Sequence, residues 1–139
     1  MLCLLNYLDY DNYKLRISNY ELVKDNIIQT KSFEFALKII KLFNYLNQEK
    51  HEYILSKQLL RSGTSIGANV EEAIGGQSRN DFISKLSVAY KEARESQYWL
   101  KLLYSSGYIP SFQVEILQRD IDEMLRIIGR IQKTMKVNS

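Results

Sequence analysis

The stretch from Leu55 to Ile74 constrains the fold more than any other part of the chain. Its glycines and hydroxyl residues, in Ser62-Gly63-Thr64-Ser65 and Ile66-Gly67, are typical of a loop. Its spacing favours a helix, because apolar and small residues recur every three or four positions along one helical face. These residues are Leu55, Leu59, Ser62, Ile66, Val70 and Ala73. We therefore predict one continuous helix.

Gly63 and Gly67 lie four residues apart beside this stripe. A glycine inside a helix costs about 1 kcal/mol relative to alanine. Close approach of a neighbouring helix backbone would offset that cost, so we expect these two glycines at a close helix–helix contact.

Length and composition favour a single all-α domain. The chain has 139 residues, with one Pro and six Gly, which are few for an all-β protein.

Three further amphipathic helices are predicted. The first begins after Asp25 or Asn26 and ends near Gln48, the third begins at Ser78 or at Asn80 and Asp81, and the fourth has Pro110 in its first turn. The glycine-containing helix is expected from about Glu52, and Ser105, Ser106 and Gly107 end the third.

The apolar stripe of the first helix is unusually wide. Because it covers nearly half the circumference, we expect part of it to face a third helix or another subunit. The residues are Ala36, Ile39, Ile40, Phe43 and Leu46, widened by Phe33, Phe35 and Leu42.

The short predicted links between the four helices indicate an antiparallel up-down-up-down four-helix bundle over residues 26–139. Residues 1–25 are expected to form a separate N-terminal arm, extended or disordered, because Tyr13, Leu15 and Ile17 alternate with polar residues. The alternative is upstream sequence included by a misplaced start codon.

Two segments resemble a known family: QLLRSGTSIGANVEEA at residues 58–73 and SRNDFISKLSVAYKEARESQYWLKLL at residues 78–103. They are similar to the four-helix-bundle proteins encoded in intervening sequences of bacterial 23S rRNA genes, a family related to accessory proteins of diversity-generating retroelements. The resemblance spans roughly Ile27 to Lys136. It implies a homopentamer with a basic surface that binds RNA or DNA and, in the retroelement members, a reverse transcriptase.

Residue types and spacings do not indicate an enzyme, a metal site or a cofactor. His51 is the single histidine and lies in a polar link, and the single cysteine, Cys3, lies outside the region of resemblance. Neither phosphate-loop glycine spacing nor an inward Glu-x-x-His motif is present. The lone cysteine also excludes an intramolecular disulfide and fits a reducing cytoplasm. The apolar start is a poor signal peptide, and no run is long enough to span a membrane.

Two polar surfaces are candidate binding sites. A polar seam is expected between the second and third helices, either as a partner site or, as we favour, as a network that sets helix register. It comprises Arg61, Ser65, Asn69, Glu72, Lys85 and Glu92. The other surface is basic and lies on the last helix, where four basic and no acidic residues follow from Arg126 onward. Its predicted nucleic-acid-binding residues are Arg79, Arg94, Arg119, Arg126, Arg130, Lys133 and Lys136.

A row of cations repeated by oligomer symmetry would form a positive band for phosphates. The structural alternatives are compensation of the helix dipole and ordinary ion pairs with Glu115 or Asp122. We expect a non-enzymatic homo-oligomer that binds nucleic acid, RNA in particular. The alternative is a protein-interaction scaffold, for example for a reverse transcriptase.

Overall fold

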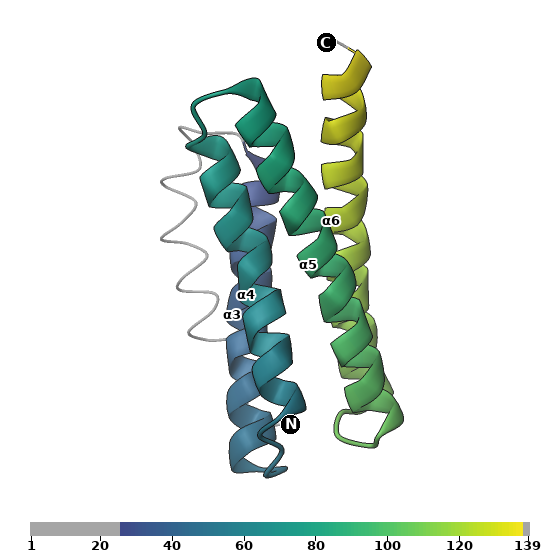
Figure 1. Ribbon diagram of the computed structural model, residues 1–139. Coiled ribbons are helices and arrows are strands. Elements are labelled where there is room, and N and C mark those ends of the chain that lie inside the picture. The colour runs from purple at the N-terminus through teal and green to yellow at the C-terminus, as the bar shows by residue number, and fades with distance from the viewer. Residues whose placement is uncertain (1–25, 138–139) are drawn as a thin grey trace.

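The computed structural model describes residues 26–137, which form four α-helices. They are α3 (Ile27–Gln48), α4 (Leu55–Ile74), α5 (Arg79–Ser105) and α6 (Ser111–Val137). Each helix packs against its neighbours in the order α3, α4, α5 and α6, and α6 returns to α3. The predicted antiparallel four-helix bundle is thus confirmed (Figure 1). The predictions for residues 1–25, including the arm and Cys3, fall outside the described residues.

Side-chain caps determine where two helices begin. The side chain of Asn26 accepts a hydrogen bond from the backbone N–H of Gln29 (3.3 Å), and that of Ser78 accepts one from Asp81 (3.1 Å). Each satisfies an N–H that has no partner within the first turn of its helix. Of the alternatives at the start of α5, Ser78 is therefore the cap.

The last helix begins one residue after Pro110. The carbonyl of Pro110 accepts bonds from the N–H groups of Gln113 and Val114, at 3.2 and 3.3 Å. Pro110 thus precedes the first turn rather than lying within it.

Glu52 caps α4 from outside the helix, which begins at Leu55 rather than at Glu52 itself. The carboxylate accepts hydrogen bonds from the N–H groups of Ile54 (3.1 Å), Leu55 (2.8 Å) and Ser56 (2.7 Å). Burial alone would raise the pKa of this carboxyl, but the backbone bonds from Leu55, Ser56 and Ile54 outweigh burial and lower it below its usual value.

The core follows the predicted stripe of α4 closely but only part of the predicted stripe of α3. Along α3 the buried apolar residues are Ile28, Phe35, Ile39, Leu42, Tyr45 and Leu46. Phe33 and Ile40, predicted within the stripe, are 42% and 41% exposed. The stripe is wider than its neighbours cover, and its excess lies on the outside of the bundle.

Small residues allow α4 to approach its neighbours closely. A Cβ added to Gly63 would lie 2.9 Å from Cγ1 of Ile39, and one added to Gly67 would lie 3.4 Å from the carbonyl oxygen of Ser32. Both glycines therefore face α3. On the α5 side, the hydroxyl of Ser96 donates to the hydroxyl of Ser62 across 2.9 Å, with both residues fully buried.

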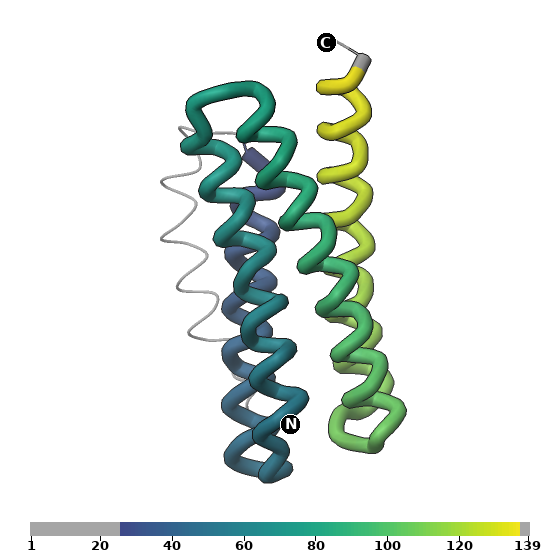
Figure 2. Tube along the Cα trace, in the orientation of Figure 1, coloured from purple at the N-terminus to yellow at the C-terminus, as the bar shows by residue number. Residues whose placement is uncertain are grey.

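The helices α5 and α6 diverge along the bundle. They lie together near the turn that connects them and separate toward the chain's C-terminal end (Figure 2). Hydrogen bonds link them along their length: Gln97 donates to Asp122 (2.8 Å), Gln132 donates to Ser87 (2.9 Å), and Gln118 donates to the carbonyl of Gln97 (3.2 Å).

Candidate nucleic-acid interface

Four basic side chains form the α6 basic row, which we define as Arg119, Arg126, Arg130 and Lys133. All four are exposed. Their spacing places them within a narrow arc opposite the buried residues Leu117, Ile121, Met124 and Ile128. At a rise of about 1.5 Å per residue, the row extends over about 21 Å. It is therefore long enough to contact several phosphates of one strand.

Within the described part of the chain, none of these four cations forms an ion pair. The ion pairs there involve Lys31 with Glu123, Lys38 with Asp120, Arg61 with Glu92 and Glu95, and Lys85 with Glu72. Asp122, which precedes Arg126 by one turn, accepts instead from Gln97. The intrahelical ion pairs considered as a structural alternative for the row are thus not formed.

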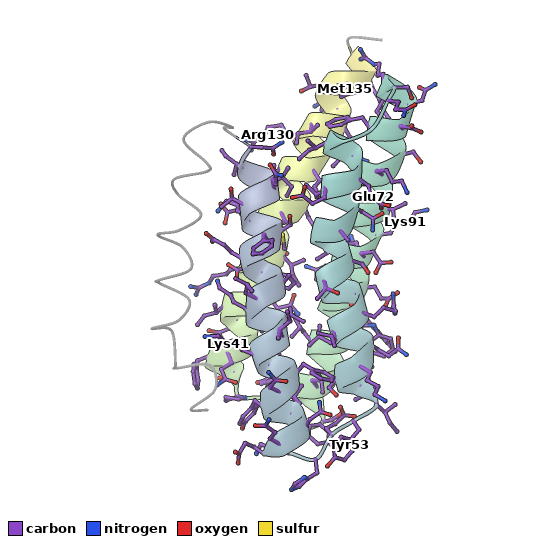
Figure 3. All side chains as sticks on the ribbon, turned by 90° about the vertical axis from the view of Figure 1, so that its left-hand side faces the viewer. Lys41, Tyr53, Glu72, Lys91, Arg130 and Met135 are labelled. Carbon is purple, nitrogen blue, oxygen red and sulfur yellow. The ribbon has the colours of Figure 1, made fainter. Side chains whose placement is uncertain are left out.

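The other predicted phosphate contacts have different surroundings. The guanidinium of Arg79 donates to the backbone carbonyl of Met135 in the last turn of α6, so Arg79 joins α5 to α6. Lys136 is exposed in that same turn, where a cation offsets the negative end of the helix dipole. Arg94 is exposed on α5. Lys91 of α5 and Arg130 of α6 lie on opposite sides of the bundle (Figure 3).

The polar seam between α4 and α5 consists mainly of ion pairs. Arg61 bonds Glu92 (3.3 Å) and Glu95, and Lys85 pairs with Glu72 (3.5 Å). The indole of Trp99 donates to Glu95 (2.9 Å), which fixes that carboxylate beside Arg61.

The remaining seam residues bond within their own helix. Ser65 donates to the carbonyl of Arg61 (2.6 Å), and the amide of Asn69 donates to the carbonyl of Ser65 (2.8 Å). The structure thus brings Arg61, Glu72, Lys85 and Glu92 together across the helices, but not Ser65 and Asn69. Arg61 and Lys85 thus each form an ion pair between α4 and α5, as a network that sets helix register would require.

An apolar groove lies on the outer surface where α3 meets α4. Its volume is about 310 Å³. Gly67 and Ala68 leave its α4 side shallow, and the exposed side chains of Phe33 and Ile40 line its α3 side. Spacing indicated the excess apolar width of α3, but the position of the groove depends on the small residues of α4.

The residues considered for catalysis do not form a reactive arrangement among the described residues. His51 is exposed beyond α3, with a φ of 53°, and its Nδ1 lies 3.1 Å from the hydroxyl of Tyr53 at the end of the bundle (Figure 3). No cluster of three His, Cys, Asp or Glu side chains suited to a metal ion occurs within residues 26–137. The same part of the chain has no helix long and apolar enough to cross a membrane.

Two residues with a bearing on the site were not singled out from the sequence. The sequence predicts Glu52 as the first residue of the glycine-containing helix, whereas in the structure it caps that helix from outside; an acidic residue at a helix N-terminus is the signal for such a cap. Gly129 lies inside α6 between members of the basic row. An isolated glycine within a long amphipathic helix was the signal that could have identified it.

Comparison with known proteins agrees with this architecture. Residues 24–130 match the family described as 23S rRNA-intervening sequence protein. The match includes Arg119, Arg126 and Arg130 but ends before Lys133. No curated protein sequence matches the chain.

A crystal structure of a protein of unknown function, from the S23 ribosomal protein family of Bacteroides thetaiotaomicron VPI-5482, is similar to the bundle. The two are 48% identical in sequence with a TM-score of 0.76, and the match covers 77% of this chain and 99% of that one. The four helices, the close α3–α4 contact and the family match lead to one conclusion: the chain belongs to the 23S rRNA-intervening sequence protein family.

Proposed function

We propose that the protein is a non-enzymatic, homo-oligomeric RNA-binding protein that contacts the sugar–phosphate backbone through the α6 basic row. The observation that carries the proposal is the exposure of four neighbouring cations that lack ion pairs within the described residues. A carboxylate partner would compete with phosphate, whereas an unpaired cation is available to replace the counterions of a nucleic acid. Contacts of this kind give affinity with little base readout.

Salt dependence tests this proposal. For a single strand, the logarithm of the association constant falls by about 0.7 per unit of log salt concentration for each phosphate contacted. If each of the four cations contacts one phosphate, the total slope is about −3. Fluorescence anisotropy of a labelled single-stranded RNA at several salt concentrations measures the slope. Arg126→Ala is expected to make it shallower by about 0.7 and to weaken binding about fivefold near 0.1 M salt.

Lys57→Ala is the matched control, because Lys57 is exposed on α4, away from the row. Equal affinity of Arg126→Ala, Lys57→Ala and the unmodified protein, or an affinity independent of salt, would refute the proposal. The same titration with duplex RNA and with DNA identifies the preferred nucleic acid.

The apolar groove between α3 and α4 favours a second candidate function, a scaffold that docks another protein, for example a reverse transcriptase. An exposed groove lined by Phe33 and Ile40 offers apolar surface that a partner would bury. Recovery of a stoichiometric protein from nuclease-treated lysate, lost with Phe33→Asp, would support this function over RNA binding.

A further inference from the structure

Gly129 has no explanation in the packing of its own chain. It lies inside α6, and a Cβ added there would have no neighbouring atom within 4 Å. Gly63 differs, because Ile39 occupies the space that its side chain would need. A helical glycine costs about 1 kcal/mol relative to alanine. An external group that approaches the backbone of α6 would account for its use here.

The neighbours of Gly129 on the helix surface are two members of the α6 basic row. Arg126 precedes it by three residues and Lys133 follows it by four, so all three share one face. The two cations are about 10 Å apart along the axis, at a rise of about 1.5 Å per residue. Within the described residues neither has an ion pair. Gly129 therefore forms a gap in the side-chain surface between two available cations.

The helix α5 adds a third cation about one turn away along the bundle. Asp122 and Gln132, which bond α5, lie seven residues before and three after Gly129, so Gly129 is on the α5-facing side of α6. Arg94 lies seven residues after Ser87 and three before Gln97, the partners of those bonds, so it is on the α6-facing side of α5. Because Gln97 bonds Asp122 and Ser87 bonds Gln132, Arg94 lies opposite position 125, about one turn of α6 before Gly129. The two helices separate toward this end of the bundle, which leaves the gap open (Figure 2).

We infer that Gly129 seats a backbone phosphate of the bound RNA strand, with Arg94, Arg126 and Lys133 around it. Guanidinium and ammonium groups donate charge-assisted hydrogen bonds to phosphate oxygens. The missing side chain lets the sugar–phosphate backbone approach α6 more closely than alanine or leucine would allow. The inference rests on the proposed function and deepens it, because it states where the strand crosses the basic row.

A substitution that fills the gap without changing charge tests the inference. Gly129→Leu is expected to fold and to melt at a higher temperature than the unmodified protein, because leucine is the better helix former and a Cβ at this position meets no neighbouring atom within 4 Å. Its affinity for a labelled single-stranded RNA, measured by anisotropy, is expected to fall at least about fivefold, the effect of one lost phosphate contact near 0.1 M salt. Gly129→Ala is expected to lie between the two proteins in affinity.

Asn44→Leu is the control for an added apolar side chain, because Asn44 is exposed on α3. If Arg126→Ala weakens RNA binding but Gly129→Leu does not, the proposed function stands and the inference falls. If neither changes binding, both fall. A third outcome is that the unmodified protein binds inorganic phosphate and Gly129→Leu does not, while the two proteins bind RNA equally well. This outcome would assign the gap to a free anion. A changed molar mass with unchanged RNA affinity would assign it to a subunit contact, and both results overturn the inference.

Discussion

Gly63 and Gly129 show how differently two helical glycines act in this bundle. Ile39, against which Gly63 packs, is fully buried, and its branched Cβ limits how far its methyl groups can move away. Gly129 has free space where its side chain would be. Both glycines lower the helix propensity of their helices by about the same amount. Only Gly63 is required by the packing of the bundle.

At the residue scale we predict opposite effects of the same substitution at these two sites. Gly63→Ala introduces about 1–3 kcal/mol of overpacking strain, which exceeds the gain in helix propensity of about 1 kcal/mol. Gly129→Ala gains helix propensity without overpacking strain, so it is expected to stabilise the protein by about 0.5–1 kcal/mol. Urea unfolding followed by circular dichroism measures both. A stabilised Gly63→Ala variant would contradict the close α3–α4 contact.

At the scale of the helix, α4 depends on polar groups at its start and along its α5 side. Glu52 satisfies N–H groups that the helix itself leaves without partners. Arg61 of α4 pairs with Glu92 of α5, and Glu72 of α4 pairs with Lys85 of α5, but all of these groups are partly exposed, so each pair contributes little to stability. Removal of the buried cap is therefore expected to matter more than removal of either ion pair.

The Glu52 cap predicts a specific loss of stability in acid. Because folding lowers the pKa of this carboxyl, its contribution is complete above the ordinary glutamate pKa of about 4.3 and is lost as the pH falls through the lower pKa of the folded state. Glu52→Ala is expected to lower the free energy of unfolding by about 1–2 kcal/mol at neutral pH.

Glu52→Gln keeps an acceptor oxygen but cannot titrate, so its difference from the unmodified protein is expected to shrink below about pH 4. Urea unfolding at neutral and acidic pH measures this. A difference that stays constant between the two pH values would show that the charge of Glu52 does not strengthen the cap.

At the scale of the whole molecule, the apolar groove and the basic row occupy different helices. The groove lies between α3 and α4, whereas the row lies on the outward face of α6. Lys31 and Lys38 of α3 pair with Glu123 and Asp120 of α6, which fixes the two surfaces relative to each other. Self-association in which the groove meets a surface other than α6 would leave the row exposed and repeat it around the oligomer.

We predict that Ile40→Asp shifts the protein toward monomer, because a carboxylate in the groove would lose its hydration on association. Ile116→Asp is the matched control, since Ile116 of α6 is also 41% exposed but does not line the groove. Light scattering coupled to gel filtration measures the molar mass. Equal masses for the two variants would show that the groove is not the contact between copies.

Much of the bundle could be predicted from the sequence because its signals are local. The period of Leu59, Ile66 and Val70 encodes a buried helical face even across two glycines, and Asn26 and Ser78 cap helices that directly follow them. The predicted fold and the family resemblance are both confirmed. The exposure of Phe33 and Ile40 was less predictable, since periodicity shows that a face is apolar but not how much of it the neighbouring helices cover.

The sequence by itself determined the four helices, the apolar stripe of α4 and the concentration of cations near the C-terminus, because these depend on residue type and spacing along one helix. Only the tertiary structure decided which cations lack ion pairs, where the groove opens and that Gly129 faces α5 in open space. The physical reason is that each of these properties depends on distances between helices, and a periodic pattern within one helix does not specify those distances.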